Sequence, residues 1–266
     1  MIPTKARYLK NFWISWATPH VDYNPGEARG LSRGDVVIGI NKKVQAFNPL
    51  TEFISARLRR EKRLLSPEVT HARVHISNVE SLYFAFYPNG KNEPYGLYST
   101  YWMNPLDLLD LPDDGQSIGD LGIKIVEGFV EDMSIYKYAV GGFPIEVFES
   151  AIADFRANEM KVSYRPVIRE IVGSSVKSVF TVYASPNETA IWVAFKKGRK
   201  EFFSKQIASH RAGLAGHALT FVYVTICEDA LEIHGAMLPS SEVQRIEFTE
   251  LPSQLVDILS SEVSRG

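Results

Sequence analysis

The stretch KSVFTVYASPNETAIWVAFKKG, residues 177–198, constrains the fold of this chain more than any other. Two runs rich in β-branched and aromatic residues flank the turn sequence ASPNET, a pattern that predicts a β-hairpin. Just before it, residues 142–160 place apolar side chains, including Phe148 and Phe155, at the spacing of an amphipathic helix. We therefore expect an α+β protein with a mostly antiparallel sheet and helices packed on it.

Other segments extend this pattern. We expect a second hairpin from VTHARVHI (69–76) and SLYFAFYP (81–88), and further strands at NFWISWAT (11–18), GDVVIGI (34–40) and VQRIEF (243–248). Helices are expected at residues 48–65, 200–217 and 253–263. Residues 103–122 are acidic and rich in turn residues, which indicates a domain boundary or a long surface excursion.

Composition excludes several classes of protein. The 266 residues suffice for one large domain or two modest ones, and the net charge of −2 implies no global attraction to nucleic acid or anionic lipid. A single cysteine excludes an intrachain disulfide and any multi-cysteine metal site. No run resembles a signal peptide or reaches the roughly 20 apolar residues of a membrane span. We expect a cytoplasmic protein with no cofactor and no bound metal.

The only cysteine, Cys227, follows the strand-like run VYVTI, and we interpret CEDALEIHG (227–235) as a helix that begins at the thiol. A cysteine at a helix N-terminus ionises readily, because the unpaired amides and the helix dipole favour negative charge. Cys227 is therefore a candidate nucleophile. The alternative is a lone thiol that acts as a small core hydrophobe.

A thiolate nucleophile needs a base, usually an imidazole that the fold brings to it. The expected strand 69–76 carries two of the six histidines, His71 and His75, on one face. A strand histidine beside a helix headed by cysteine is the arrangement of papain-like enzymes.

The motifs GDVVIGI, Thr70–His71 and CEDALEIHG follow one another in an order that resembles that of the permuted papain-like cysteine hydrolases. These enzymes are the YiiX-like branch of the NlpC-type peptidase superfamily. The lecithin retinol acyltransferase-like enzymes belong to the same superfamily. The resemblance covers residues 31–87 and 190–238. It implies that Cys227 attacks an amide, peptide or acyl-ester bond and that His71 is its base.

The same resemblance sets the expected domains and the third catalytic residue. Residues 1–100 and 176–266 would form the papain-like core, and residues 101–175 an insertion or small second lobe. Phe84 stands where the family has a polar residue that orients the histidine. Glu80 and His75 are the two candidates to replace it.

A second function class remains open. The expected helix 48–65 has a basic face that carries Arg57, Arg59, Arg60 and Arg63. Such a face is typical of a phosphate-binding surface, so the chain could be a non-catalytic nucleic-acid or partner-binding subunit of a larger assembly. The alternative is a solvated helix face, since Glu52 and Glu61 dilute its charge.

Overall fold

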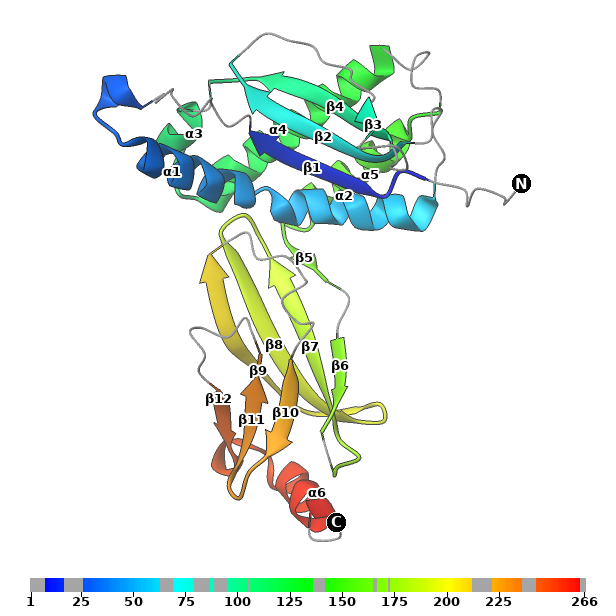
Figure 1. The fold of residues 1–266 in the computed structure, drawn as a ribbon. Coiled ribbons are helices and arrows are strands. Elements are labelled where there is room, and N and C mark those ends of the chain that lie inside the picture. The colour runs from blue at the N-terminus through cyan, green and yellow to red at the C-terminus, as the bar shows by residue number, and fades with distance from the viewer. Residues whose placement is uncertain are drawn as a thin grey trace. The chain divides into compact units, whose positions relative to one another are not determined.

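The computed structural model describes residues 8–16, 26–62, 69–78, 87–88, 95–104, 106–135, 142–164, 167–171, 173–211, 222–235 and 243–263. The chain divides into two compact units (Figure 1). The first comprises Met1–Val162 and Ser185–Asn187, and the second comprises Ser163–Ala184 and Glu188–Gly266. This division differs from the expected core and inserted lobe, because residues 101–162 belong to the same unit as residues 1–100. The α+β class itself is confirmed.

The described part of the first unit combines a four-stranded sheet with helices. Its elements are β1 (Asn11–Trp16), η1 (Glu27–Arg29), α1 (Arg33–Gln45), α2 (Asn48–Glu61), β2 (Val69–Ser77), β3 (Tyr87–Pro88), β4 (Tyr95–Trp102), α3 (Asp107–Asp110), α4 (Gly115–Ile135) and α5 (Ile145–Ala157). The acidic stretch 103–122 is therefore no domain boundary, since it forms α3 and the first turns of α4. Buried Ile118 and Ile123 anchor that helix in the core.

The sheet of this unit has the strand order β1-β2-β4-β3, and β2 runs parallel to both β1 and β4. A parallel pair needs a long crossover, and α1 and α2 supply it between β1 and β2. The hairpin expected from residues 69–76 and 81–88 is wrong, because both edges of β2 are already paired. Of the second run, Tyr87–Pro88 pairs with β4 instead, and residues 81–86 lie outside the described part of the chain.

GDVVIGI is helical, which corrects the expected strand at 34–40. The hydroxyl of Ser32 accepts a hydrogen bond from the backbone N–H of Asp35 at 3.1 Å and so caps α1. Val36, Ile40 and Lys43 form its buried stripe at a spacing of three to four residues. Ser32 followed by Asp35 three residues later is a pattern that indicates the start of a helix, and this signal was missed. Without such a cap, the run VVIGI fits a helix and a strand equally well.

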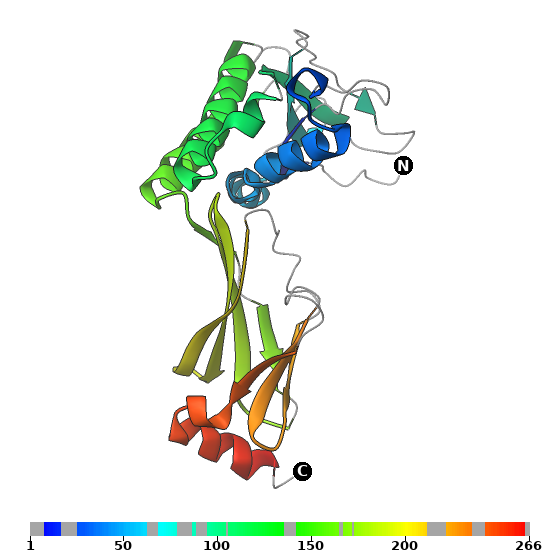
Figure 2. The same ribbon diagram turned by 90° about the vertical axis from the view of Figure 1, so that its left-hand side faces the viewer.

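One face of the sheet forms the core of the first unit. The ring of Phe12 on β1 packs 5.2 Å from both Phe129 of α4 and Phe148 of α5. The backbone N–H of Phe12 also donates to Ser55 of α2 at 2.9 Å, and Trp16 Nε1 donates to Asn41 of α1 at 2.8 Å. Helices α4 and α5 thus pack on this face, and Figure 2 shows them together on one side of the strands. Helix α2 lies along β1, because Ser55 bonds to the backbone of Phe12.

The second unit is mostly β-structure. Its elements are β6 (Val167–Glu170), β7 (Lys177–Ala184), β8 (Glu188–Lys197), β9 (Lys200–Arg211), β10 (Tyr223–Ile226), β11 (Ala230–His234), β12 (Gln244–Glu247), η4 (Phe248–Glu250) and α6 (Ser253–Val263). One sheet has the strand order β5-β7-β8-β9, and β6 also pairs with β7. Strand β5 (Val162–Ser163) lies where the two units meet along the chain. The other sheet has the strand order β10-β11-β12. The predicted hairpin 177–198 is confirmed as β7 and β8, which pair antiparallel along their full length.

The expected helix at 200–217 is wrong for its described part, which forms β9. Gly198, with φ +60°, provides the tight turn that folds β9 back on β8, and Lys197 pairs with Lys200 on either side of it. Because this turn brings residues 200–211 beside β8, they pair with β8 as a strand, although the spacing of their apolar residues also fits a helix. Residues 212–217 lie outside the described part of the chain.

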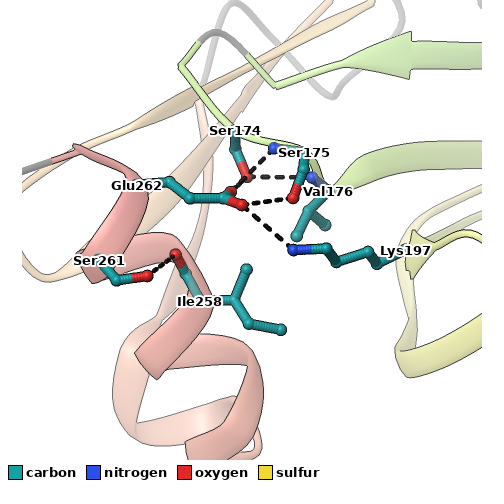
Figure 3. A network of polar contacts seen from close by, with 7 residues as sticks. All are labelled: Ser174, Ser175, Val176, Lys197, Ile258, Ser261 and Glu262. Atoms are coloured by element: carbon teal, nitrogen blue, oxygen red, sulfur yellow. Dashed lines mark hydrogen bonds and ion pairs between the residues drawn. The ribbon is translucent and has the colours of Figure 1, made fainter. Parts of the chain in front are cut away.

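Helix α6 closes the core of the second unit by burying Leu255 and Leu259 against the sheets. Glu262 in its last turn bonds to the loop before β7 and to Lys197 (Figure 3). This carboxylate accepts hydrogen bonds from Ser174 Oγ and from the Ser175 backbone N–H and hydroxyl, and an ion pair joins it to Lys197 at 3.2 Å. These donors, the serines first, lower the pKa of Glu262 to about 2.

Candidate functional site

Cys227 does not begin a helix. Its backbone N–H bonds to the carbonyl of Ala230 at 2.9 Å, in the turn that joins β10 to β11. Beyond the turn Leu231 and Ile233 are buried, whereas Glu232 and His234 are only partly buried. This alternation has the period of a strand, so the interpretation of residues 227–235 as a helix is wrong.

The surroundings of Cys227 oppose thiolate formation. Burial, a hydrogen bond to Glu232 and the negative charge of that carboxylate raise the pKa of the thiol. Without a helix N-terminus, the backbone provides no compensating positive field. The physical argument for a reactive cysteine at this position is therefore lost.

The other residues of the expected catalytic set lie elsewhere. His71 belongs to the first unit and Cys227 to the second, so neither unit by itself brings them together. Of the two candidates for the third residue, Glu80 lies outside the described residues, and His75 lies on β2 with His71. The cysteine hydrolase activity stays a prediction.

The basic helix face is partly neutralised. An ion pair joins Arg57 to Asp154, and Arg57 also donates to Ser150 Oγ at 2.9 Å. Arg59 lies 3.8 Å from Glu52 and donates to Asn11 Oδ1 at 3.2 Å. Arg60 is exposed on α2, and Arg63 lies outside the described residues. Two of the four arginines thus already have carboxylate partners within the unit.

A second cluster lies on the sheet face opposite the helices. We call it the polar face and define it by Trp13, Ser15, His71, Arg73, His75, Gly96, Tyr98, Thr100 and Trp102. Cross-strand pairs place Trp13 and Tyr98 on either side of Arg73, and Ser15 and Thr100 on either side of His75. Trp102, at the end of β4, is 67 % exposed. Trp13 faces away from Phe12 and the helices.

Arg73 is the central cation of the polar face. Its guanidinium lies over the indole of Trp13, 5.3 Å from the ring centroid. Its Nε is buried and has no hydrogen-bond partner, and no carboxylate forms an ion pair with it, among the residues that the structure describes. A partly buried guanidinium without a counterion favours binding of an anion, since leaving its donors unpaired costs free energy.

His71 is held by its neighbours at one end of the polar face. Its Nε2 lies 3.2 Å from the hydroxyl of Tyr98, and its Nδ1 lies 3.4 Å from that of Thr70. The ring lies above Gly96, where a Cβ would come within 2.2 Å of Nε2. At 9 % exposure, His71 is a buried residue. His71 therefore fixes the position of Tyr98 and is not itself open to a ligand.

His75 has a more accessible imidazole. Its Nδ1 lies 3.0 Å from Ser15 Oγ, and its ring stacks on Tyr98 with 5.9 Å between centroids and an angle of 9° between planes. No partner for Nε2 lies among the described residues. The ring is thus oriented through one nitrogen and available for chemistry through the other.

Both histidines are biased toward the neutral form. Burial and then the positive charge of Arg73 lower the pKa of His71, and the same two causes lower the pKa of His75. At neutral pH the polar face thus carries one guanidinium between two uncharged imidazoles. Such a face can hold an anion at Arg73, stack planar groups on its aromatic rings and accept a proton at His75.

The sequence pointed to part of this cluster. The spacing of His71 and His75 predicted that they share a strand face, and the structure confirms this. The partners from β1 and β4 were missed, because the parallel pairing that brings them beside β2 leaves no local signal. The alternation of polar and apolar residues in THARVHI could have indicated that Arg73 lies between the histidines on that face.

No protein-family model, curated protein or solved structure matches this chain. Among the described residues, no group of three or more His, Cys, Asp or Glu side chains could hold a metal ion, and no helix is long and apolar enough to cross a membrane.

Proposed function

We propose that the first unit binds single-stranded nucleic acid through the polar face. The observation that carries the proposal is Arg73, a guanidinium without a carboxylate partner among the described residues, held on the ring of Trp13. A phosphate supplies the missing anion and fits the donor geometry of arginine.

The flanking rings favour a nucleic acid over a free anion. Tyr98 and Trp102 lie on the same face of β4, four residues apart, which corresponds to about 13 Å along a strand. Aromatic side chains spaced along a sheet face stack on successive unpaired bases, and each such contact is worth roughly 1–3 kcal/mol. A duplex hides the faces of its bases, so this surface suits a single strand.

Local charge supports binding here despite the net charge of −2. A phosphate bound at Arg73 would lie beside one positive charge and two neutral imidazoles, because the pKa of each histidine is lowered. The basic face of α2 is a weaker candidate, since Arg57 and Arg59 have carboxylate partners. Nucleic-acid binding, the second function class expected from the sequence, is therefore proposed for the sheet and not for α2.

The test is the anisotropy of a labelled single-stranded RNA titrated with the full chain at several salt concentrations. We expect Arg73→Gln to weaken binding about tenfold and to reduce the salt dependence by about one phosphate contact. Trp13→Leu should also weaken binding about tenfold through lost stacking.

The matched control is Arg60→Gln, which removes an exposed arginine of α2 and should leave binding unchanged. Weaker binding by Arg60→Gln together with unchanged binding by Arg73→Gln would move the site to α2. No binding at low salt would overturn the proposal. Circular dichroism melts of each variant separate loss of binding from loss of folding.

A further inference from the structure

We propose that the polar face also cleaves single-stranded RNA, with His75 taking the proton of a ribose 2′-hydroxyl while Arg73 binds the adjacent phosphate. This inference rests on the proposed function, because the strand must bind before it is cut. It adds a reaction and limits the substrate to RNA.

The position of His75 suits a general base. In one tautomer of His75, Nδ1 carries the hydrogen and donates it to Ser15 Oγ, which leaves the lone pair on Nε2. Stacking on Tyr98 fixes the plane of the ring. Nε2 is thereby the nitrogen that meets a bound ribose. The lowered pKa keeps this nitrogen unprotonated at neutral pH, as a base requires.

Arg73 lies where the phosphate charge would develop. It precedes His75 by two residues on β2, so the two side chains leave the same face about 7 Å apart. A long guanidinium side chain and an imidazole at that separation can reach the same nucleotide. Arg73 would stabilise the extra negative charge on the phosphoryl oxygens as the transition state forms.

The reaction is an internal transesterification. Oxygen 2′ bonds to phosphorus as its proton passes to His75 Nε2, and the bond from phosphorus to the 5′-oxygen breaks. The 5′-oxygen takes a proton from water, and the imidazolium of His75 returns its proton to solvent. The products are a 2′,3′-cyclic phosphate and a 5′-hydroxyl, and no further reactant is needed.

His71 and Tyr98 act as positioning residues in this scheme. The hydrogen bond of 3.2 Å between them holds the Tyr98 ring on which His75 stacks. The charged and titratable groups that share the described face with His75 are Arg73, His71 and Tyr98. DNA lacks the 2′-hydroxyl, so the same face should bind DNA without cutting it.

The experiment incubates labelled single-stranded RNA with the full chain in EDTA and measures both cleavage products and binding. We expect RNA ending in a 2′,3′-cyclic phosphate, no cleavage of matched DNA, and a rate that rises with pH to a plateau near neutrality. His75→Asn should reduce the cleavage rate at saturating RNA by about 100-fold or more, a loss larger than any change in RNA affinity measured in parallel. His210→Asn, on β9 of the second unit, is the matched control and should cleave normally.

The outcomes separate the two proposals. If the chain binds RNA through Arg73 but leaves it intact, or if His75→Asn cleaves at the original rate, the cleavage inference is overturned and binding stands. If the chain binds no RNA, both are overturned.

Discussion

The absence of a side chain at Gly96 makes room for the imidazole of His71. A Cβ built at Gly96 would lie 2.2 Å from His71 Nε2 and 2.8 Å from the ring of Tyr98. Two neighbouring strands therefore fit together only because one of them carries glycine at this register position. The hydrogen bond between His71 and Tyr98 depends on that space.

Gly96→Ala should destabilise the chain by about 1–3 kcal/mol, because the histidine ring must move and its bond to Tyr98 is lost. Urea denaturation measures the change. The control is Gly128→Ala in the middle of α4, where the new Cβ meets only Tyr101 at 3.7 Å and a helical position favours alanine. Unchanged stability in Gly96→Ala would contradict the described packing of β2 against β4.

Protonation of His71 and His75 should destabilise the first unit in acid. The pKa of His71 and of His75 is lowered from the ordinary 6.5, so the unfolded chain takes up these protons at a higher pH than the folded chain. Stability is complete above 6.5 and should fall as pH drops below it. Urea denaturation across this range should show a smaller fall in the double variant H71Q/H75Q. An equal fall would show that other groups are responsible.

Cys227 should react slowly with iodoacetamide at neutral pH, since burial and Glu232 raise the pKa of its thiol. Glu232→Gln removes the nearby negative charge and should accelerate labelling, as measured by intact mass. The control is Glu201→Gln, which removes a carboxylate paired with Lys196 on the other sheet of the unit. Labelling faster than that of a free cysteine peptide would restore Cys227 as a candidate nucleophile.

Glu262 should hold the last turn of α6 in place over most of the pH range. Its pKa in the folded chain is about 2, below the ordinary 4.5, so its stabilising contribution is complete above 4.5 and disappears as pH falls toward 2. Glu262→Gln should therefore increase amide hydrogen exchange in α6 at neutral pH and change it little near pH 2. Glu201→Gln again serves as the control. Equal exchange in both variants would show that apolar contacts alone anchor the helix.

Local signals carried much of the fold prediction. Alternation on both sides of ASPNET predicted β7 and β8, and the spacing of Phe148 and Phe155 predicted α5, because each pattern is complete within one element. The predictions for GDVVIGI, CEDALEIH and KEFFSKQIAS were wrong where a cap or turn decides between helix and strand. Ser32 begins a helix, Gly198 reverses the chain, and Glu228 and Asp229 form the turn after Cys227.

The candidate site was harder to predict, because its residues meet through parallel pairing. His71 and His75 were found from one strand. Trp13, Ser15 and Tyr98 join them from strands that are distant in sequence, and only the register of β1 and β4 against β2 shows which of their residues share the face. The partial burial of Arg73 and its lack of a carboxylate partner among the described residues also depend on these neighbouring strands, so the sequence of β2 alone could not predict them.

The parallel crossover between β1 and β2 also governs when the polar face comes into being. Trp13 can meet Arg73 only when the chain between them, which includes α1 and α2, has returned along the sheet. Closing such a long loop costs entropy before any cross-strand contact offsets it. During synthesis, a ribosome-bound chain can therefore complete the polar face only after β4 has emerged.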